Sequence, residues 1–197
     1  MSPTILIALL SAAIPSYFTP GPNNLMLMTS SARFGMGRTV PHALGIVAGF
    51  PFMVFVVGLG LGEVFVLLPW LKTALQFAAA AYFLWMAWHL LGFSIGNAKG
   101  GERPLRFHEA AMFQWINPKA WAMAASFVVL AVEPGTGHMT SLLHLTAICL
   151  AIAPLSCATW MAFGQQLQSF LQRSGLQRHL GAVLAGLMLL AVVLFLV

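Results

Sequence analysis

The stretch Thr19-Pro20-Gly21-Pro22-Asn23-Asn24 interrupts the first long apolar run of the chain. Pro20 and Pro22 have no backbone N–H, so the carbonyls of Ser16 and Phe18 lose the partners that a continuous helix would supply. A bilayer offers no replacement partners, and irregular backbone at membrane depth is tolerated only where protein or a water-filled cavity covers it. The motif therefore favours a discontinuous membrane helix that lines a substrate site. The alternative is a surface loop between two short helices.

The composition of the chain indicates a membrane protein. Hydrophobic residues make up 60% of its 197 residues and charged residues 7%, whereas a soluble domain carries about 25% charged residues. Nine basic and four acidic residues cannot cover a globule of this size with a solvated surface. Because the apolar runs are long and continuous rather than alternating, we expect an all-α, polytopic membrane protein and not a β-barrel.

The length of the chain fits about six spanning helices of about 20 residues each, in a single transmembrane domain over 1–197. The expected spans are about 3–31, 39–61, 70–91, 107–132, 141–163 and 180–197. A polar loop at about 92–106 separates the third and fourth spans, and 165–178 is expected to be a polar connector or an interfacial helix. In the second span, the spacing Gly45-x3-Gly49 is of the kind that lets helices approach closely.

Basic residues gather in alternate connections between the expected spans. The first, third and fifth connections hold seven Lys and Arg residues, and the second and fourth hold one. The positive-inside rule then places the first, third and fifth connections in the cytoplasm and both termini outside. This scattered distribution of a net charge of +5 argues against a nucleic-acid partner. No Lys or Arg precedes the first apolar run, which argues against a cleaved signal peptide.

A second proline interruption, Asn117-Pro118-Lys119, opens the fourth span as Pro20-Gly21-Pro22-Asn23 interrupts the first. Three spans is an odd number, so a repeat over about 107–197 must cross the membrane in the opposite sense to a repeat over about 1–91. Transporters with such inverted repeats bind substrate near the midplane, between discontinuous helices in corresponding positions. We see no residue-by-residue identity between the halves, so this prediction rests on topology and on the positions of the two breaks.

The groups at the two breaks suit a zwitterion. Asn23 is expected to cap a second half-helix, and Asn117 to cap a half-helix that begins at Pro118, which deprives the Gln114 carbonyl of its helical donor. Half-helix N-termini favour a carboxylate, and freed carbonyls favour an ammonium group. An amino acid offers both. The candidate substrate-binding residues are Pro20, Gly21, Pro22, Asn23, Asn24, Gln114, Asn117, Pro118 and Lys119.

Lys119 is the only charge clearly inside an expected span. It either lies deep, where it could hold a carboxylate or respond to coupling protons, or extends to the cytoplasmic interface. No acidic residue lies clearly within a span, so neither a carboxylate proton relay nor a sodium site is evident. Most histidines fall near membrane edges, where packing roles are favoured; His89 and His144 are the two candidate proton carriers.

The sequence contains no motif that is typical of an enzyme active site. Cys149 and Cys157, eight residues apart on nearly one helical face, are too far apart for a disulfide and are expected to be packed thiols. We find no Ser/His/Asp arrangement, phosphate-binding loop or Cys/His metal spacing. The sequence therefore predicts neither an enzyme nor a bound cofactor.

Two regions carry a family resemblance. Thr19-Pro20-Gly21-Pro22-Asn23 with 38–49 (RTVPHALGIVAG) resembles the opening signature of the lysine exporter (LysE/RhtB) family of amino-acid exporters. The segments 71–91 (LKTALQFAAAAYFLWMAWHLL) and 113–127 (FQWINPKAWAMAASF) are similar to its third and fourth helices. The resemblance implies proton-driven efflux of amino acids or close derivatives across the bacterial inner membrane. It carries over to Pro20, Gly21, Pro22, Asn23, Asn117, Pro118 and Lys119.

The chain departs from the family pattern at three positions. Many members have Asp where Asn23 stands, Asn24 replaces a usually apolar residue, and His89 is unexpected. The missing acid leaves the coupling mechanism open. The expected partners are a small zwitterionic substrate, the lipid bilayer and further copies of the chain. The alternatives are an exporter of a metal ion or another small solute, which sparse intramembrane acids disfavour, and a non-transporting scaffold, which would have no use for broken helices.

Overall fold

The computed structural model of the chain describes residues 1–60, 103–133, 135–176 and 179–196, with isolated residues between 67 and 91. Over these residues the regular structure is entirely helical, as expected. Its elements are α1 (Pro3–Phe18), α2 (Pro22–Phe34), α3 (Met36–Gly58), α6 (Phe107–Phe113), the 3-10 turn η2 (Gln114–Ile116), α7 (Pro118–Ala131), the 3-10 turn η3 (Gly135–Gly137), α8 (His138–Arg173) and α9 (Leu180–Leu196). Most of the third expected span and the loop 92–102 lie outside the described residues.

The first expected span is broken as the proline motif predicts. α1 ends at Phe18 and α2 begins at Pro22, and their axes differ by 44°. The described residues contain two helices long and apolar enough to cross a membrane, namely α3 and the stretch 135–173 with α8, or three if the bent α1–α2 pair is one span. This agrees with a polytopic membrane protein, while the number six stays a prediction.

The fourth expected span is also interrupted where expected. α6 passes into η2, and Asn117 then adopts an extended conformation (φ −88°, ψ 105°) before α7 begins at Pro118. Glycines bring this segment close to α3. A side chain at Gly45 would overlap the Phe107 carbonyl of α6, and one at Gly49 would lie 2.7 Å from the Ala111 Cα. The Gly45-x3-Gly49 spacing is therefore confirmed as a site of close helix approach.

The fifth expected span ends later than the sequence suggested. We expected it to stop near 163, but α8 is one continuous helix of 36 residues that includes Pro154 and the polar residues from Gln165 onward. Gln, Leu and Arg propagate a helix well, and the next strong helix terminator is Gly175, which has φ +68°. Gly164 lies against the Met28 carbonyl of α2, so packing also holds the helix at this position.

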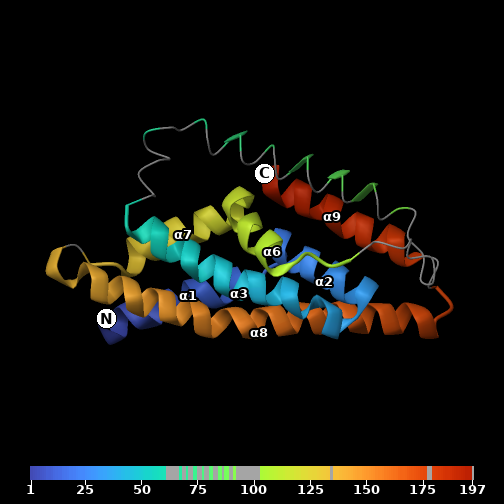
Figure 1. The fold of residues 1–197 in the computed structure, drawn as a ribbon, viewed down its shortest axis with the longest axis horizontal. Helices are drawn as coiled ribbons and strands as arrows, with labels where there is room; N and C mark the ends of the chain where they lie inside the picture. Colours follow the sequence, from blue (N-terminus) through green and yellow to red (C-terminus); the bar gives the residue numbers. More distant parts are fainter. Residues whose placement is uncertain are drawn as a thin grey trace.

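The helices pack around α8, which runs the length of the molecule with α1, α2 and α3 beside it (Figure 1). The buried apolar residues form two clusters. The α1–α7 cluster joins α1, the second half of α3, α7 and the first half of α8. The α2–α6 cluster joins α2, the first half of α3, α6, the second half of α8 and part of α9. Both helix breaks therefore lie at the boundary between the two clusters.

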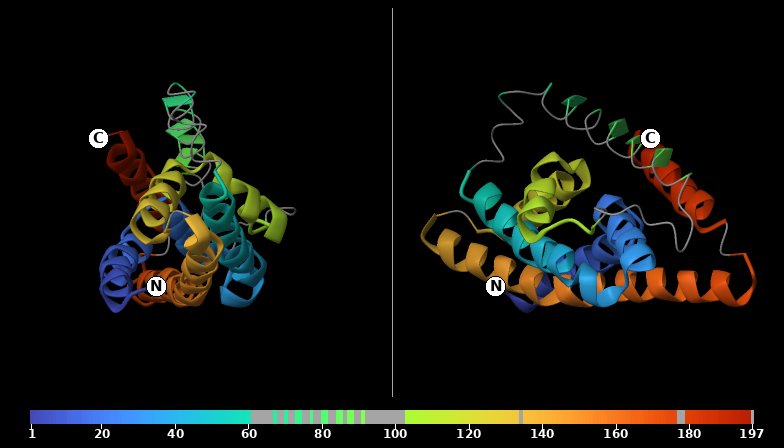
Figure 2. Two further views of the ribbon diagram at one scale, coloured as in Figure 1. Left: turned by 90° about the vertical axis from the view of Figure 1, so that its left-hand side faces the viewer. Right: turned by 45° about the vertical axis from the view of Figure 1, so that its right-hand side comes forward.

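α9 stands apart from the helices that surround the breaks. End-on, Figure 2 shows it leaning away from the group formed by α1, α2, α3, α7 and α8. Its buried residues Leu184 and Ala185 belong to the α2–α6 cluster, and α9 contacts α2. The breaks are consequently enclosed by α1, α2, α3, α7 and α8 rather than by α9.

Candidate functional site between the two helix breaks

The C-terminal end of α1 is closed by side chains that replace the missing helical donors. The single hydrogen of the Thr19 hydroxyl is shared between the Pro15 carbonyl at 2.8 Å and the Ser16 carbonyl at 3.2 Å, so it partly replaces one of the two donors that the prolines remove. The Asn24 amide donates to the carbonyls of Tyr17 and Thr19, both at 2.8 Å. The Ser156 hydroxyl of α8 also donates to the Tyr17 carbonyl, at 2.7 Å. Asn24 thus caps the helix that precedes it.

The N-terminal end of α2 differs from the expectation. Gly21, not Asn23, is the residue before the first helical position, and no side chain caps this end. The reason is Pro22, whose fixed φ starts the helix at the first position and moves Asn23 inside the first turn. The prediction that Asn23 caps α2 is therefore wrong.

Asn23 instead joins the two breaks. Its Nδ2 donates to Gln114 Oε1 over 2.7 Å, and Gln114 Nε2 donates back to Asn23 Oδ1 over 3.2 Å. Gln114 has no exposed surface, and its Nε2 also donates to the Ala110 carbonyl over 2.9 Å. A reciprocal amide pair between residues 91 positions apart therefore holds the breaks against each other.

The second break has the local structure that the sequence predicts. Pro118 occupies the start of α7, and the Asn117 side chain accepts a hydrogen bond from the Lys119 backbone N–H at 3.1 Å. Pro118 has no N–H to donate to the Gln114 carbonyl. That carbonyl instead accepts a hydrogen bond from the Asn117 N–H over 3.2 Å. The prediction that Asn117 caps this half-helix is confirmed.

The Lys119 side chain is directed at the first break. Its Nζ donates to the carbonyl and the hydroxyl of Thr19, both at 3.1 Å, and to the Pro20 carbonyl at 3.4 Å. Gly21 makes room for it, because a Cβ there would lie 2.8 Å from Lys119 Cδ and 3.0 Å from Nζ. Over the described part of the chain, no carboxylate pairs with this ammonium. The Lys119 ammonium is therefore bound by carbonyl and hydroxyl oxygens and not by a carboxylate.

A small cavity lies between the breaks. Its volume is about 40 Å³, which is room for a few water molecules and too little for an amino acid. Of the candidate residues, Gly21, Asn23, Asn24, Asn117 and Lys119 line it. Gln114 lies behind Asn23, and Pro20, Pro22 and Pro118 act through the backbone. The remaining lining residues are Ser16, Tyr17, Ile46, Phe50, Ala120, Met123, Ala153, Ser156 and Cys157.

The sequence reasoning missed the contribution of α1 and α8 to this cavity. Tyr17 donates its hydroxyl to the Cys149 carbonyl at 3.1 Å, and Ser156 and Cys157 face the break from α8. A signal existed, because Pro154 lies inside the fifth expected span and the small polar residue Ser156 and Cys157 come two and three positions after it.

The position of His42 agrees with the packing role expected of most histidines. His42 on α3 is 1% exposed, and its Nδ1 lies 3.1 Å from the Ser30 hydroxyl of α2. Of the two candidate proton carriers, His144 is exposed on α8 and His89 lies outside the described residues.

The electrostatic field in the cavity has two poles. The first turns of α2 and α7 and the Lys119 ammonium supply positive charge, because helix N-termini carry free N–H groups and partial positive charge. The carbonyls of Tyr17, Thr19 and Pro20 supply the negative pole at the end of α1. The arrangement therefore places groups that attract a carboxylate beside groups that attract an ammonium group, around one small cavity.

Comparisons with known proteins place the chain among membrane translocators. The family model of the LysE type translocator matches residues 16–197. The cysteine/O-acetylserine efflux protein of Klebsiella pneumoniae is 25% identical over 188 residues, which is 95% of each chain. Proteins of the same description from Escherichia coli O157:H7 and strain K12 are 25% identical over 190 and 186 residues, covering 96% and 94% of each chain. No solved structure matches the chain.

Proposed function

Because the chain belongs to the LysE type translocator family, we propose that it exports amino acids or close derivatives across the bacterial inner membrane. Translocators of this family move solutes and do not transform them, so the protein is a membrane transporter and not an enzyme. The similar proteins are described as exporting cysteine and O-acetylserine, both small zwitterions. Substrates of that size and charge are the ones we propose here.

The observation that carries the proposal is the pairing of opposite poles in one cavity. A substrate carboxylate would bind at the first turns of α2 and α7 beside Lys119, and its ammonium group at the end of α1. Asn23 and Asn117 would orient the molecule between them. Gln114 would hold Asn23 in place through the reciprocal amide pair. This assigns a role to each candidate residue that lines or supports the cavity.

The proposed architecture is six spans in two inverted repeats, about 1–91 and about 107–197, within one domain. The mixed composition of the two apolar clusters supports it. α1, before the first break, packs with α7, after the second, and α2 shares the other cluster with α6. Two antiparallel broken helices produce this crossed pairing. The cavity of about 40 Å³ must widen to admit a substrate, which supports alternating access around the breaks.

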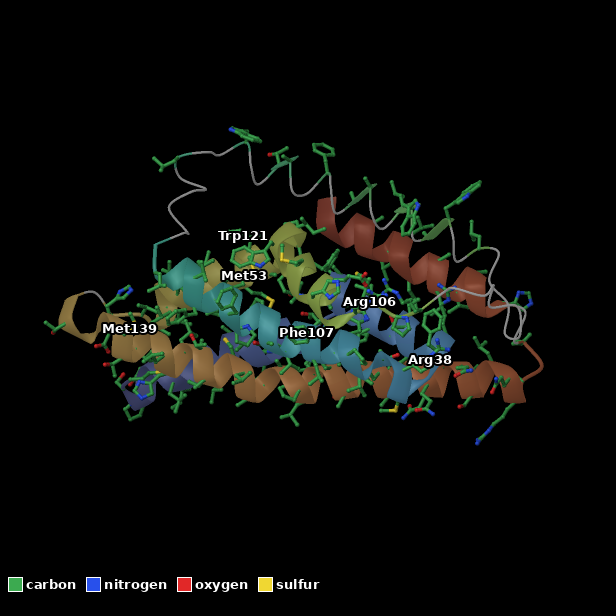
Figure 3. All side chains as sticks on the ribbon, in the orientation of Figure 1. Arg38, Met53, Arg106, Phe107, Trp121 and Met139 are labelled. Atoms are coloured by element: carbon green, nitrogen blue, oxygen red, sulfur yellow. The ribbon has the colours of Figure 1, made fainter. Side chains whose placement is uncertain are left out.

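The proposed orientation places both termini outside. In Figure 3, Arg38 of the first connection and Arg106 of the third lie toward one end of the molecule, and Met139 lies toward the other. Clustering of basic residues at one end supports a cytoplasmic face there. Exposed apolar side chains such as Val129, 86% exposed, and Phe52, 59% exposed, suit contact with lipid or with a second copy of the chain.

A transport assay in proteoliposomes with an imposed pH gradient tests the proposal. The panel contains L-cysteine, O-acetyl-L-serine and analogues that lack the carboxylate or the amine. We expect uptake or release of the complete amino acids above protein-free liposomes, accelerated by the gradient if protons drive export. The Asn23→Ala and Lys119→Ala variants should insert in the membrane and lose this activity. Equal transport of analogues without a carboxylate would exclude the proposed site.

The alternatives make different predictions in the same assay. The described residues that line the cavity include no carboxylate and no imidazole, so among them a divalent metal ion would lack these usual ligands. A non-transporting scaffold would leave every solute in the panel unmoved. Transport of a metal ion or inactivity toward all amino acids would therefore favour one of these alternatives.

A further inference from the structure

Lys119 occupies a set of oxygen atoms that the first break leaves available. The Thr19 carbonyl, the Thr19 hydroxyl and the Pro20 carbonyl converge on Nζ at 3.1, 3.1 and 3.4 Å. Three acceptors around one ammonium match the three donors of that group. We call these three oxygens the Thr19–Pro20 cradle. Their geometry is suited to any primary ammonium group and not only to that of a lysine.

The position of Lys119 is poor for a positive charge in every other respect. Lys119 belongs to the first turn of α7, and its ammonium lies beside Gly21 at the start of α2. Helix N-termini disfavour cations and favour anions. Within the described ranges no carboxylate is paired with Lys119. An anion that entered the cavity would therefore stabilise the Lys119 ammonium. If Lys119 moved to that anion, the cradle oxygens would need another ammonium group.

An amino acid supplies both charges at once. We propose that the α-ammonium group of the substrate displaces the Lys119 ammonium from the Thr19–Pro20 cradle, and that the released Lys119 binds the substrate carboxylate. The inference rests on the proposed export function and deepens it. Before and after the exchange the cradle holds one ammonium group, so the three oxygens keep their hydrogen-bond donors.

This exchange selects for molecules that carry both groups. A simple amine must compete with Lys119 and offers it no carboxylate in return. A simple acid can pair with Lys119 only by leaving the cradle empty. An amine binds only the molecules in which Lys119 has left the cradle, so its apparent affinity is the intrinsic affinity multiplied by the fraction of such molecules. Removing Lys119 should thus have opposite effects on amines and on acids.

The test uses the full chain purified in detergent and three probes under reducing conditions, namely cysteamine, 3-mercaptopropionate and L-cysteine. Affinities are measured by thermal stabilisation and by calorimetry. In Lys119→Met we expect cysteamine to bind about tenfold more tightly, because its competitor is gone, and 3-mercaptopropionate to bind about tenfold more weakly. Lys119→Gln provides a second, polar replacement with the same expected signs.

Two further variants serve as controls. Thr19→Val removes the hydroxyl of the cradle at nearly constant volume, so the Thr19→Val/Lys119→Met double variant should lose most of the gain in cysteamine affinity. Arg173→Met removes a cation from the last turn of α8, where its side chain is exposed, and should change none of the affinities. Circular dichroism and elution volume establish that each variant is folded.

The possible outcomes separate this proposal from the export proposal. If folded Lys119→Met and Lys119→Gln bind cysteamine no better than the wild type, the exchange is refuted even if L-cysteine is transported. If cysteamine affinity rises and the rise depends on Thr19, the exchange stands. A wild type that transports no amino acid in proteoliposomes refutes the export proposal independently, because cysteamine binding is measured without transport.

Discussion

At the scale of single residues, the site depends on amide and ammonium groups that satisfy freed backbone or one another. Gln114 has no exposed surface, and its amide is paired with Asn23 and with the Ala110 carbonyl. A buried amide that loses its partner costs far more than the pair contributes when it is intact. Stability measurements on this pair therefore report how tightly the two breaks are joined.

Replacing Asn23 by Ala should destabilise the protein by about 1–3 kcal/mol, because the Gln114 amide stays buried without its partner. Unfolding in detergent, followed by circular dichroism, measures the change. The Gln165→Ala variant, at an exposed position of α8, is the matched control and should be close to neutral. If Asn23→Ala is as neutral as the control, the amide pair does not join the breaks.

Replacing Gly21 by Ala should reduce export about tenfold, by roughly 1.4 kcal/mol of lost substrate interaction, without unfolding the protein. The backbone at Gly21 is extended (φ −178°), so any residue can adopt it. Gly21 lines the cavity, so the added Cβ, 2.8 Å from Lys119 Cδ, would narrow the space in which the substrate ammonium has to replace that of Lys119. Gly37→Ala, whose Cβ meets no atom within 4 Å, is the control for proteoliposome export. Wild-type rates in Gly21→Ala would contradict this role.

The second break could be predicted from the sequence more fully than the first. Asn117-Pro118 specifies its own geometry, since Pro fixes the first helical position and the preceding Asn reaches the next N–H. The role of Asn23 could not be read this way, because its partner Gln114 is 91 residues away. The freed carbonyls at the end of α1 could also be predicted. Their binding to Lys119 could not, because it depends on how α1 and α7 pack.

At the scale of elements, glycines set the distances between helices. Gly45 and Gly49 let α3 touch the backbone of α6, and Gly164 lets α8 touch that of α2. These contacts fix the positions of α6 and α2, one half-helix from each break. The glycine spacing on α3 was readable from the sequence, whereas the extent of α8 was not, because polarity after 163 does not end a helix that lacks a breaker.

Replacing Gly45 by Val should destabilise the protein by about 1–3 kcal/mol, because the new side chain overlaps the Phe107 carbonyl and forces α3 and α6 apart. Thermal unfolding in detergent measures the loss. Gly186→Val on α9, where a Cβ meets no atom within 4 Å, controls for the generic cost of Val in a helix. Equal losses in both variants would show that α3 and α6 do not need the close approach.

At the scale of the whole molecule, the two apolar clusters meet at the breaks around a cavity that is too small for a substrate. Under the proposed alternating access, the two clusters would move relative to each other, with the breaks as hinges. The all-α class, both breaks and the membrane location followed from the sequence. The number of spans and their orientation depend on counting apolar spans and basic residues in segments that include 70–91 and 92–102. Both therefore stay predictions.

Widening of the cavity should make Cys157 reactive. Cys157 lines the cavity and is 5% exposed, while Cys149 is fully buried and does not line it. In proteoliposomes of the Cys149→Ser variant, labelling by N-ethylmaleimide should accelerate several-fold during transport of O-acetyl-L-serine. The Cys157→Ser variant, which keeps only Cys149, should label slowly with or without substrate. A labelling rate of Cys157 that ignores the substrate would argue against opening at the breaks.

The crossed composition of the clusters also bears on how such a chain can diversify. Each cluster takes elements from both sides of residues 92–102, so neither half of the gene encodes a complete core. A chimera that exchanges the N-terminal half with a relative would therefore mismatch both cores at once. Exchanging α1 together with α7 would disturb the α1–α7 cluster and leave every element of the α2–α6 cluster unchanged. Exchanges that keep this protein folded therefore follow the clusters and not the order of segments in the gene.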